Sequence, residues 1–382
     1  MGGCGSSHDD LPERVRIDRE AFGVNGHLLR ALSAGGEGDL LDAHLREIEA
    51  GGLSFVRANV DWGQFEPTPP VGGEHRFDFS GTDAWVEALA RRRLRWEAIG
   101  IGASTPAWAA DQSAVAAGCG GRAPPADPDL LAAMLAAVAE RYGAGGTFWR
   151  DHPELPELPI RNYEVWNEPN HGAFWCPVPD PARFASFLAA SSDAVRGADP
   201  RARIVLGGLA PFHATESAGP GVAAKADVPS FLEALASAEP RLTEAIDAIG
   251  VHTYGDPSLI ANDLAWFRAS IDRAGFEGLP MRHNEVGWPT LGGTDPVGEE
   301  ERTDFMREIA SRSVQSDCGI EAIAPHTWIT EEADPADAEE WFGIADPRTA
   351  DPYPIALAYF DEANIARAAG AIPPESVAVV CG

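Results

Sequence analysis

The chain has 382 residues, of which 45% are hydrophobic and 23% charged, and its formal net charge is −30. This composition is typical of a soluble globular protein, and the length fits either two average domains or one large α/β barrel. The negative charge argues against nucleic acid or an anionic membrane surface as a partner, because phosphate binding needs clustered Lys and Arg. It favours a neutral substrate.

Apolar segments of strand length alternate with amphipathic segments of helix length along the chain. The expected strands are 20–25, 53–60, 94–102, 160–166, 202–208, 245–254, 279–286 and 319–329. The helices expected after them are 38–52, 81–93, 127–143, 181–197, 229–237, 258–275, 299–314 and 353–364. Strict alternation predicts a parallel sheet, and eight strand–helix pairs predict a closed (β/α)8 TIM barrel, which belongs to the α/β class. We expect one domain, 18–382, after a flexible N-terminal tether, 1–17.

The N-terminal sequence MGGCGSSHDD places a small residue before Cys4 and a polar segment after it. This arrangement resembles the end of a bacterial lipoprotein signal, in which the cysteine becomes lipid-modified. Membrane anchoring through a lipid on Cys4 and an ordinary N-terminal tail are both open interpretations. The first implies a bacterial protein that is lipid-anchored at the cell surface.

Two glutamates fall where expected strands end. Glu168 follows the fourth strand in YEVWNEPN, and Glu285 ends the seventh strand in MRHNEVGWPT. The active site of a (β/α)8 barrel lies at these strand ends. Glycoside hydrolysis requires two such carboxyl groups, one protonated to assist the leaving oxygen and one ionised to attack the anomeric carbon or activate water. The alternative is a pair of loop carboxylates without a catalytic role.

The WNEP sequence after the fourth strand, the glutamate at the end of the seventh and the eight units in order resemble the retaining glycoside hydrolases of clan A, near families 39 and 5. The resemblance covers nearly the whole barrel. It implies cleavage of β-type O-glycosidic bonds by double displacement, with Glu285 as the nucleophile and Glu168 as the general acid/base. It also implies that no metal or organic cofactor is required.

Five further residues match active-site positions of these enzymes. By this resemblance, Asn167 bonds the sugar 2-hydroxyl, Arg57 keeps the nucleophile ionised and Tyr254 donates a hydrogen bond to it. His252 is expected to line the subsite, and Trp328 to form the aromatic floor beneath the reacting sugar. The alternatives are a structural ion pair for Arg57 and ordinary core positions for His252 and Trp328.

Aromatic side chains in the expected loops are candidates for stacking on sugar rings. Trp62 and Trp175 are the first candidates, and we expect about half of the whole set to contact substrate. The other members are Phe65, Trp108, Phe174, Trp288 and Trp341. His171, just past the NEPN turn, is expected either to contact the leaving sugar or to be a solvated loop residue.

The chain has five cysteines, and none forms a CxxC or CxxH pair, which argues against a zinc site. In the barrel, Cys119 and Cys176 fall in the loops after the third and fourth strands, on the catalytic face. Cys318 falls just before the eighth strand and Cys381 after the last helix, both at the opposite face. We therefore predict the disulfides Cys119–Cys176 and Cys318–Cys381 and an oxidising compartment. Four free thiols are the alternative.

The leading hypothesis is a retaining glycosidase that acts on an oligosaccharide, a polysaccharide or another glycoside. Two alternatives remain from the sequence. One is a carbohydrate-binding surface lipoprotein without turnover. The other is a transglycosylase that uses the same two glutamates.

Overall fold

The computed structural model describes residues 15–16, 20–100, 105–219, 222–293, 295–369, 371–372 and 381. Cys4 and most of the predicted tether lie outside the described residues. Within the tether, Val15–Arg16 form strand β1, which pairs antiparallel with β10, Ala371–Ile372.

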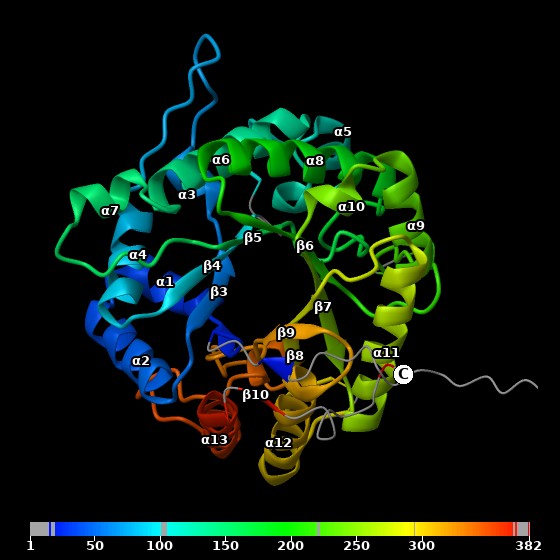
Figure 1. The fold of residues 1–382 in the computed structure, drawn as a ribbon. Helices are drawn as coiled ribbons and strands as arrows, with labels where there is room; N and C mark the ends of the chain where they lie inside the picture. Colours follow the sequence, from blue (N-terminus) through cyan, green and yellow to red (C-terminus); the bar gives the residue numbers. More distant parts are fainter. Residues whose placement is uncertain are drawn as a thin grey trace, which may run out of the picture.

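Eight parallel strands surround one axis, as the view along that axis shows (Figure 1). In chain order they are β2 (Gly23–Asn25), β3 (Phe55–Asn59), β4 (Arg95–Gly100), β5 (Asn162–Val165), β6 (Arg203–Leu209), β7 (Ala248–Tyr254), β8 (Met281–Gly287) and β9 (Ile320–Ile323). Each strand pairs with the next one along the chain. Phe22 bridges Ile323 and thereby closes the sheet between its first and last strands. The predicted (β/α)8 barrel is confirmed.

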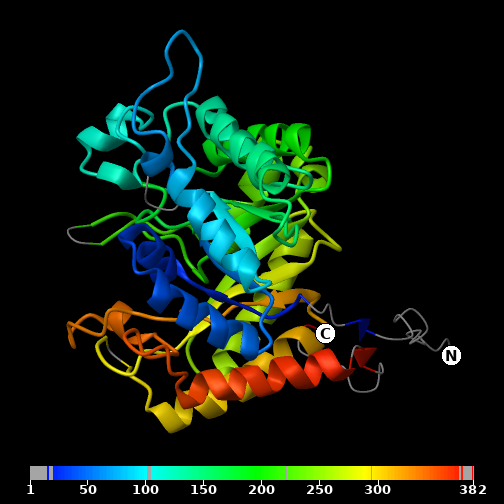
Figure 2. The same cartoon turned by 90° about the vertical axis from the view of Figure 1, so that its left-hand side faces the viewer.

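Helices cover the outside of the barrel (Figures 1 and 2). The long ones are α1 (His27–Gly35), α2 (Gly38–Ala50), α4 (Ser80–Arg91), α6 (Pro128–Tyr142), α8 (Pro181–Ala198), α9 (Val228–Ala238), α11 (Pro257–Arg273), α12 (Glu299–Gln315) and α13 (Pro354–Ala369). Shorter ones are α3 (Trp62–Phe65), α5 (Gln112–Ala116), α7 (Thr147–Asp151) and α10 (Leu242–Ala245), with the 3-10 turns η1 (Gly120–Arg122) and η2 (Ala338–Trp341). Helix α1 was not among the expected helices.

Asp-Pro pairs start several of these helices. Asp127, Asp180 and Asp256 each accept a hydrogen bond from a backbone N–H of the first helical turn. The proline that follows each of them has no N–H to leave unpaired, and its fixed φ suits the first helical position. These local signals explain why the boundaries of α6, α8 and α11 agree closely with the sequence pattern.

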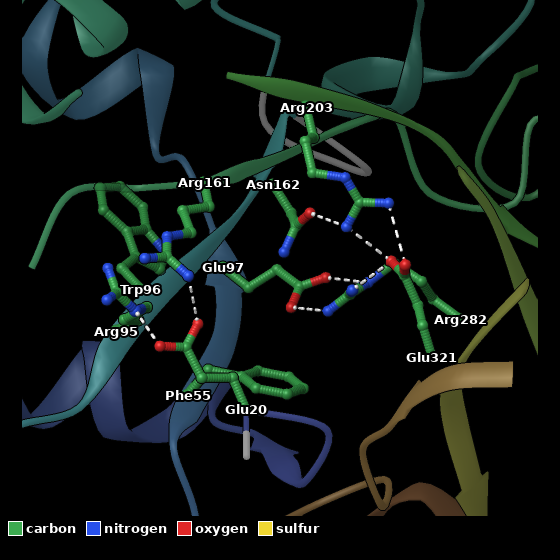
Figure 3. A pocket seen from close by; sticks show the side chains of 10 residues that line it. All are labelled: Glu20, Phe55, Arg95, Trp96, Glu97, Arg161, Asn162, Arg203, Arg282 and Glu321. Atoms are coloured by element: carbon green, nitrogen blue, oxygen red, sulfur yellow. Dashed lines mark hydrogen bonds and ion pairs between the residues drawn. The ribbon is translucent and has the colours of Figure 1, made fainter. Parts of the chain in front are cut away.

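Charged side chains close the end of the barrel where the strands begin (Figure 3). Arg282 bonds Glu97 (2.6 Å) and Glu321 (2.7 Å), and Arg203 bonds Glu321 as well (2.8 Å). Glu20 likewise bridges two further arginines. They line a small cavity of about 160 Å³. Since every arginine in it is ion-paired, this end of the barrel is a structural closure.

Both predicted disulfides are present. Cys119–Cys176 joins the loops after β4 and β5, with 5.7 Å between the Cα atoms. Cys318–Cys381 joins the segment before β9 to the residue that follows β10, with a Cα distance of 5.2 Å. Each pair therefore connects segments that the barrel brings together at one end. Among the described residues, no helix is long and apolar enough to cross a membrane.

Candidate active site

A pocket of about 540 Å³ opens at the end of the barrel where the strands finish. Its walls come from the loops after six of the eight strands. The lining residues are His27, Asn59, Asn167, Glu168, His171, Ala173, Phe174, Tyr254, Glu285, His326 and Glu339. Both predicted catalytic glutamates are therefore in one pocket.

Arg57 lies beneath the pocket floor and is fully buried. It donates two hydrogen bonds to Glu164 (2.6 and 2.8 Å) and one each to Glu285 (2.8 Å), Asn25 (2.6 Å) and Asn167 (3.0 Å). A guanidinium has five N–H groups, so all its donors are engaged by the protein. Arg57 thus fixes the position of Glu285 and of the Asn167 side chain, whose amide N–H groups stay available to a ligand.

Glu285, on β8, is held as an ionised carboxylate. Arg57 donates to its Oε1, and the hydroxyl of Tyr254 donates to its Oε2 (2.7 Å). Burial raises the pKa of Glu285, but the neighbouring imidazole of His252 and the guanidinium of Arg57 lower it strongly, with help from His326 and Tyr254. The net effect keeps the pKa far below the ordinary glutamate value, so this carboxylate stays charged and available for attack.

Glu168, after β5, lies between two imidazoles. Its Oε1 bonds Nδ1 of His252 (2.8 Å), and its Oε2 bonds Nδ1 of His171 (3.1 Å). Burial raises the pKa of Glu168, but the hydrogen bonds from His171 and His252 lower it, and the net direction is downward. A Cβ on Gly208 would lie 1.9 Å from Nε2 of His252, so glycine on β6 makes room for this histidine.

The turn that carries Glu168 has an unusual backbone. Trp166 and Glu168 both have positive φ angles, 73° and 42°. Such conformations are costly for residues other than glycine and persist only where the surroundings impose them. Here the side chain of Asn170 bonds backbone groups of Ala210 and Ala226 in the next loop (2.9 to 3.3 Å). The NEPN segment is thus pinned, and the carboxyl group of Glu168 points into the pocket.

The two glutamates are close together. A carboxylate oxygen of Glu168, one of Glu285 and a ring nitrogen of His252 all lie within 4.8 Å of one another. Retaining glycosidases place their carboxyl groups about 5–5.5 Å apart, whereas inverting enzymes need about 6.5–9.5 Å to admit a water molecule. The observed proximity matches the shorter spacing.

Three donors elsewhere in the pocket are also grouped. One ring nitrogen each of His27 and His326 and a carboxylate oxygen of Glu285 lie within 4.8 Å of one another. This is a donor set that a transition metal accepts. The guanidinium of Arg57, 2.8 Å from Glu285, opposes a cation there by charge repulsion. Hydrogen bonding to a neutral ligand suits the group better.

The predicted polar residues lie together at this pocket. Glu168, Glu285, Asn167, Tyr254 and His171 line it. Arg57 is buried below, as its expected role requires. The expectation that His252 lines the subsite is not met: it is fully buried beneath the pocket, where it bonds Glu168 and lies 3.3 Å from Glu285.

Two predicted stacking tryptophans lie elsewhere. Trp62 is fully buried, and its indole N–H donates to Glu66 (2.7 Å). Trp175 is 1% exposed and packs against Trp166 and the aromatic residues of α8. Both predictions were wrong, because these rings fill the space behind the loops. Phe174, another of the candidate aromatics, does line the pocket.

The predicted aromatic floor, Trp328, is also wrong. Its ring is fully buried on the outer side of the barrel, where it stacks on Phe360 of α13 and its indole N–H faces His44 of α2 (3.1 Å). His326, two residues earlier, lines the pocket in its place. Regular strand β9 ends at Ile323, so the side-chain alternation of a strand does not extend to these residues.

Sequence reasoning missed several residues of the site. The pocket residues not predicted are His27, Asn59, His326 and Glu339, and the buried partner of Arg57 is Glu164. Asn59 ends β3, and a polar residue at a barrel strand end is a usable signal. Glu164 gave another signal, since a glutamate inside an apolar strand needs a buried partner.

Solved structures with this fold include three enzymes that are glycoside hydrolases. A GH39 β-xylosidase from Caulobacter crescentus superposes with a TM-score of 0.61 at 18% identity, over 90% of this chain and 71% of that chain. The GH39 enzyme from Xanthomonas axonopodis pv. citri gives 0.63 at 19%, over 91% and 66%. A GH5_18 enzyme from Streptomyces cattleya, in complex with GlcNAc, gives 0.66 at 16%, over 92% and 81%.

At these identities the similarity establishes the fold. It is the (β/α)8 barrel that the sequence resemblance to families 39 and 5 implied. The chain spans about two thirds of the length of the two GH39 enzymes. No family model and no curated protein matches the sequence.

Proposed function

We propose that this protein is a retaining glycoside hydrolase that cleaves β-type O-glycosidic bonds. The observation that carries the proposal is the pair of buried glutamates in one pocket, held close together in two different environments. Glu285 is bonded by a guanidinium and a phenol, whereas Glu168 is bonded by two imidazoles. Barrel neighbours that include a β-xylosidase and an exo-β-1,4-mannosidase from Opitutaceae bacterium strain TAV5 support the same class.

In the first step, a carboxylate oxygen of Glu285 attacks the anomeric carbon of the sugar. The bond from that carbon to the leaving oxygen breaks, and Glu168 gives its proton to this oxygen. Asn167 is placed to bond the 2-hydroxyl, because Arg57 accepts no role for the amide N–H groups and holds only its oxygen. The product is a glycosyl ester on Glu285.

In the second step, Glu168 acts as a base. It removes a proton from a water molecule, whose oxygen attacks the anomeric carbon and releases Glu285. The two displacements restore the original anomeric configuration. His171 and His252, which bond Glu168 directly, are placed to take up or supply its proton between the two steps.

The test is hydrolysis of a panel of aryl β-glycosides and α-L-arabinofuranosides by the wild type and by Glu168→Ala. Proton NMR of the first product to form gives its anomeric configuration. We expect one glycone to be turned over with retention and Glu168→Ala to lose most activity, least on substrates with a good leaving group. An inverted first product would refute the retaining mechanism. Sugar binding without turnover would indicate the binding-protein alternative.

An acidic pH optimum follows from the environment of Glu168. This residue must be protonated for the first step, and its pKa lies below the ordinary value. kcat/KM should therefore fall as pH rises through that pKa, whereas Glu285, with a still lower pKa, remains ionised.

Removing a hydrogen bond to the ionised form of Glu168 raises its pKa. We therefore predict that His171→Ala moves the basic limb of the kcat/KM profile to higher pH. The matched control is His152→Ala, a histidine that bonds a glutamate on the surface far from the pocket, and its profile should equal that of the wild type. A basic limb that stays in place or moves to lower pH in His171→Ala would contradict this assignment.

We also propose that the protein acts outside the cytoplasm, because both disulfides need an oxidising compartment to form. A lipid on Cys4 is the proposed anchor.

A further inference from the structure

Two histidines of the pocket have polar atoms without partners. Nδ1 of His27 and Nδ1 of His326 are both buried, and neither makes a hydrogen bond within the described part of the chain. An unsatisfied buried polar atom costs about 1–3 kcal/mol. His27 begins α1 directly after the first barrel strand, and His326 follows the last, so the closure of the barrel brings them together beside Glu285.

The two imidazoles differ in their protonation. Burial lowers the pKa of His27 to about 4, with Arg57 and His326 contributing, so this ring is neutral and offers one donor and one acceptor. For His326, burial lowers the pKa, but Glu339 and Glu285 raise it, and the net direction is upward. A ring nitrogen of His326 also faces Glu339 (3.3 Å). The pair can therefore both donate to and accept from a hydroxyl group.

The pocket offers nothing to a negatively charged sugar. Glu168, Glu285 and Glu339 line it, and its described lining contains neither Lys nor Arg. Arg57 lies nearest, but every one of its N–H groups already bonds Asn25, Glu164, Asn167 or Glu285. A carboxylate on the sugar would meet three glutamates and find no free guanidinium.

From these observations we propose that the glycone is a neutral sugar whose ring hydroxyls are read by His27 and His326, and that glycosides of uronic acids are excluded. The inference rests on the proposed function and names the substrate class for the same site. The imidazoles bond the hydroxyls of the ring that lies on Glu285, in the place that an aromatic floor was expected to fill. Selection then depends on hydrogen bonding, which rejects an analogue lacking the hydroxyl more sharply than apolar packing does.

The first experiment compares kcat/KM of the wild type, His27→Phe and His326→Phe on the best neutral 4-nitrophenyl glycoside, on its monodeoxy analogues and on 4-nitrophenyl β-D-glucuronide. Each substitution should reduce kcat/KM on the neutral glycoside about 10- to 100-fold. On the deoxy analogue that lacks the hydroxyl in question, the variant and the wild type should be nearly equal. The glucuronide should not be cleaved. His152→Ala is the matched control, and thermal unfolding verifies that each variant is folded.

A second measurement separates this inference from the proposed function. Saturation-transfer NMR detects binding of D-glucose, D-xylose, D-galactose, D-mannose and D-glucuronate without turnover. If no glycoside is hydrolysed, yet a neutral sugar binds the wild type and is lost from both histidine variants, recognition stands and the hydrolase assignment fails. Undiminished binding or turnover in both variants, preference for the glucuronide or glucuronate, or failure of every neutral sugar to bind or react would each overturn the inference.

Discussion

Glu285→Ala is expected to lower kcat by on the order of 10⁴-fold or more, because loss of a covalent nucleophile removes the first displacement altogether. The residue is 7% exposed and bonds Arg57 and Tyr254. No other carboxylate of the pocket shares this environment, since Glu168 contacts imidazoles and Glu339 is mostly exposed. The measurement is steady-state hydrolysis of the glycoside identified by the panel.

Azide gives this experiment a diagnostic outcome. In Glu285→Ala, azide can enter the space left by the carboxyl group and attack the anomeric carbon, so it should restore turnover and yield a glycosyl azide of inverted configuration. In Glu168→Ala, azide should instead attack the glycosyl-enzyme and yield a product of retained configuration. Glu308→Ala, on the exposed face of α12, is the matched control. Near-normal activity in Glu285→Ala would show that another group is the nucleophile.

Arg57→Met is expected to destabilise the fold by about 3–5 kcal/mol, since breaking a buried ion pair leaves uncompensated charge in the interior. Arg57 and Glu164 are both fully buried, and the substitution strands the Glu164 carboxylate as well as that of Glu285. Activity should fall too, because the ionised form of Glu285 loses a charge partner and Asn167 loses a hydrogen bond. Urea denaturation and kcat/KM measure the two effects.

A second substitution separates stability from activity. Glu164→Gln removes the charge that Arg57→Met leaves buried, so the double variant should regain part of the lost stability. It should not regain activity, because Glu285 still lacks its guanidinium. Equal stability in Arg57→Met and in Arg57→Met/Glu164→Gln would contradict the assigned role of this ion pair. The matched control is Arg46→Met, which breaks an exposed pair with Asp42 and should have little effect.

The fold was predictable because its signals are local. Apolar segments of strand length, amphipathic helices and Asp-Pro starts such as Asp127-Pro128 and Asp256-Pro257 each follow from a few neighbouring residues. The order of eight units then leaves little choice of topology, since parallel strands joined by helices close into a barrel. Helix α1 was missed, because its short sequence between β2 and α2 reads as part of one connection.

The sequence by itself determined the barrel, both disulfides and the ends of strands from which Glu168 and Glu285 project. Strand ends meet at one rim, so residues at those positions converge wherever they stand in the chain. Only the tertiary structure decided which side of a loop a ring occupies: Trp328 turns outward to α2 and α13, and His326 turns in. A loop has no fixed period, so the packing around each side chain determines its direction, and that packing comes from helices distant in sequence.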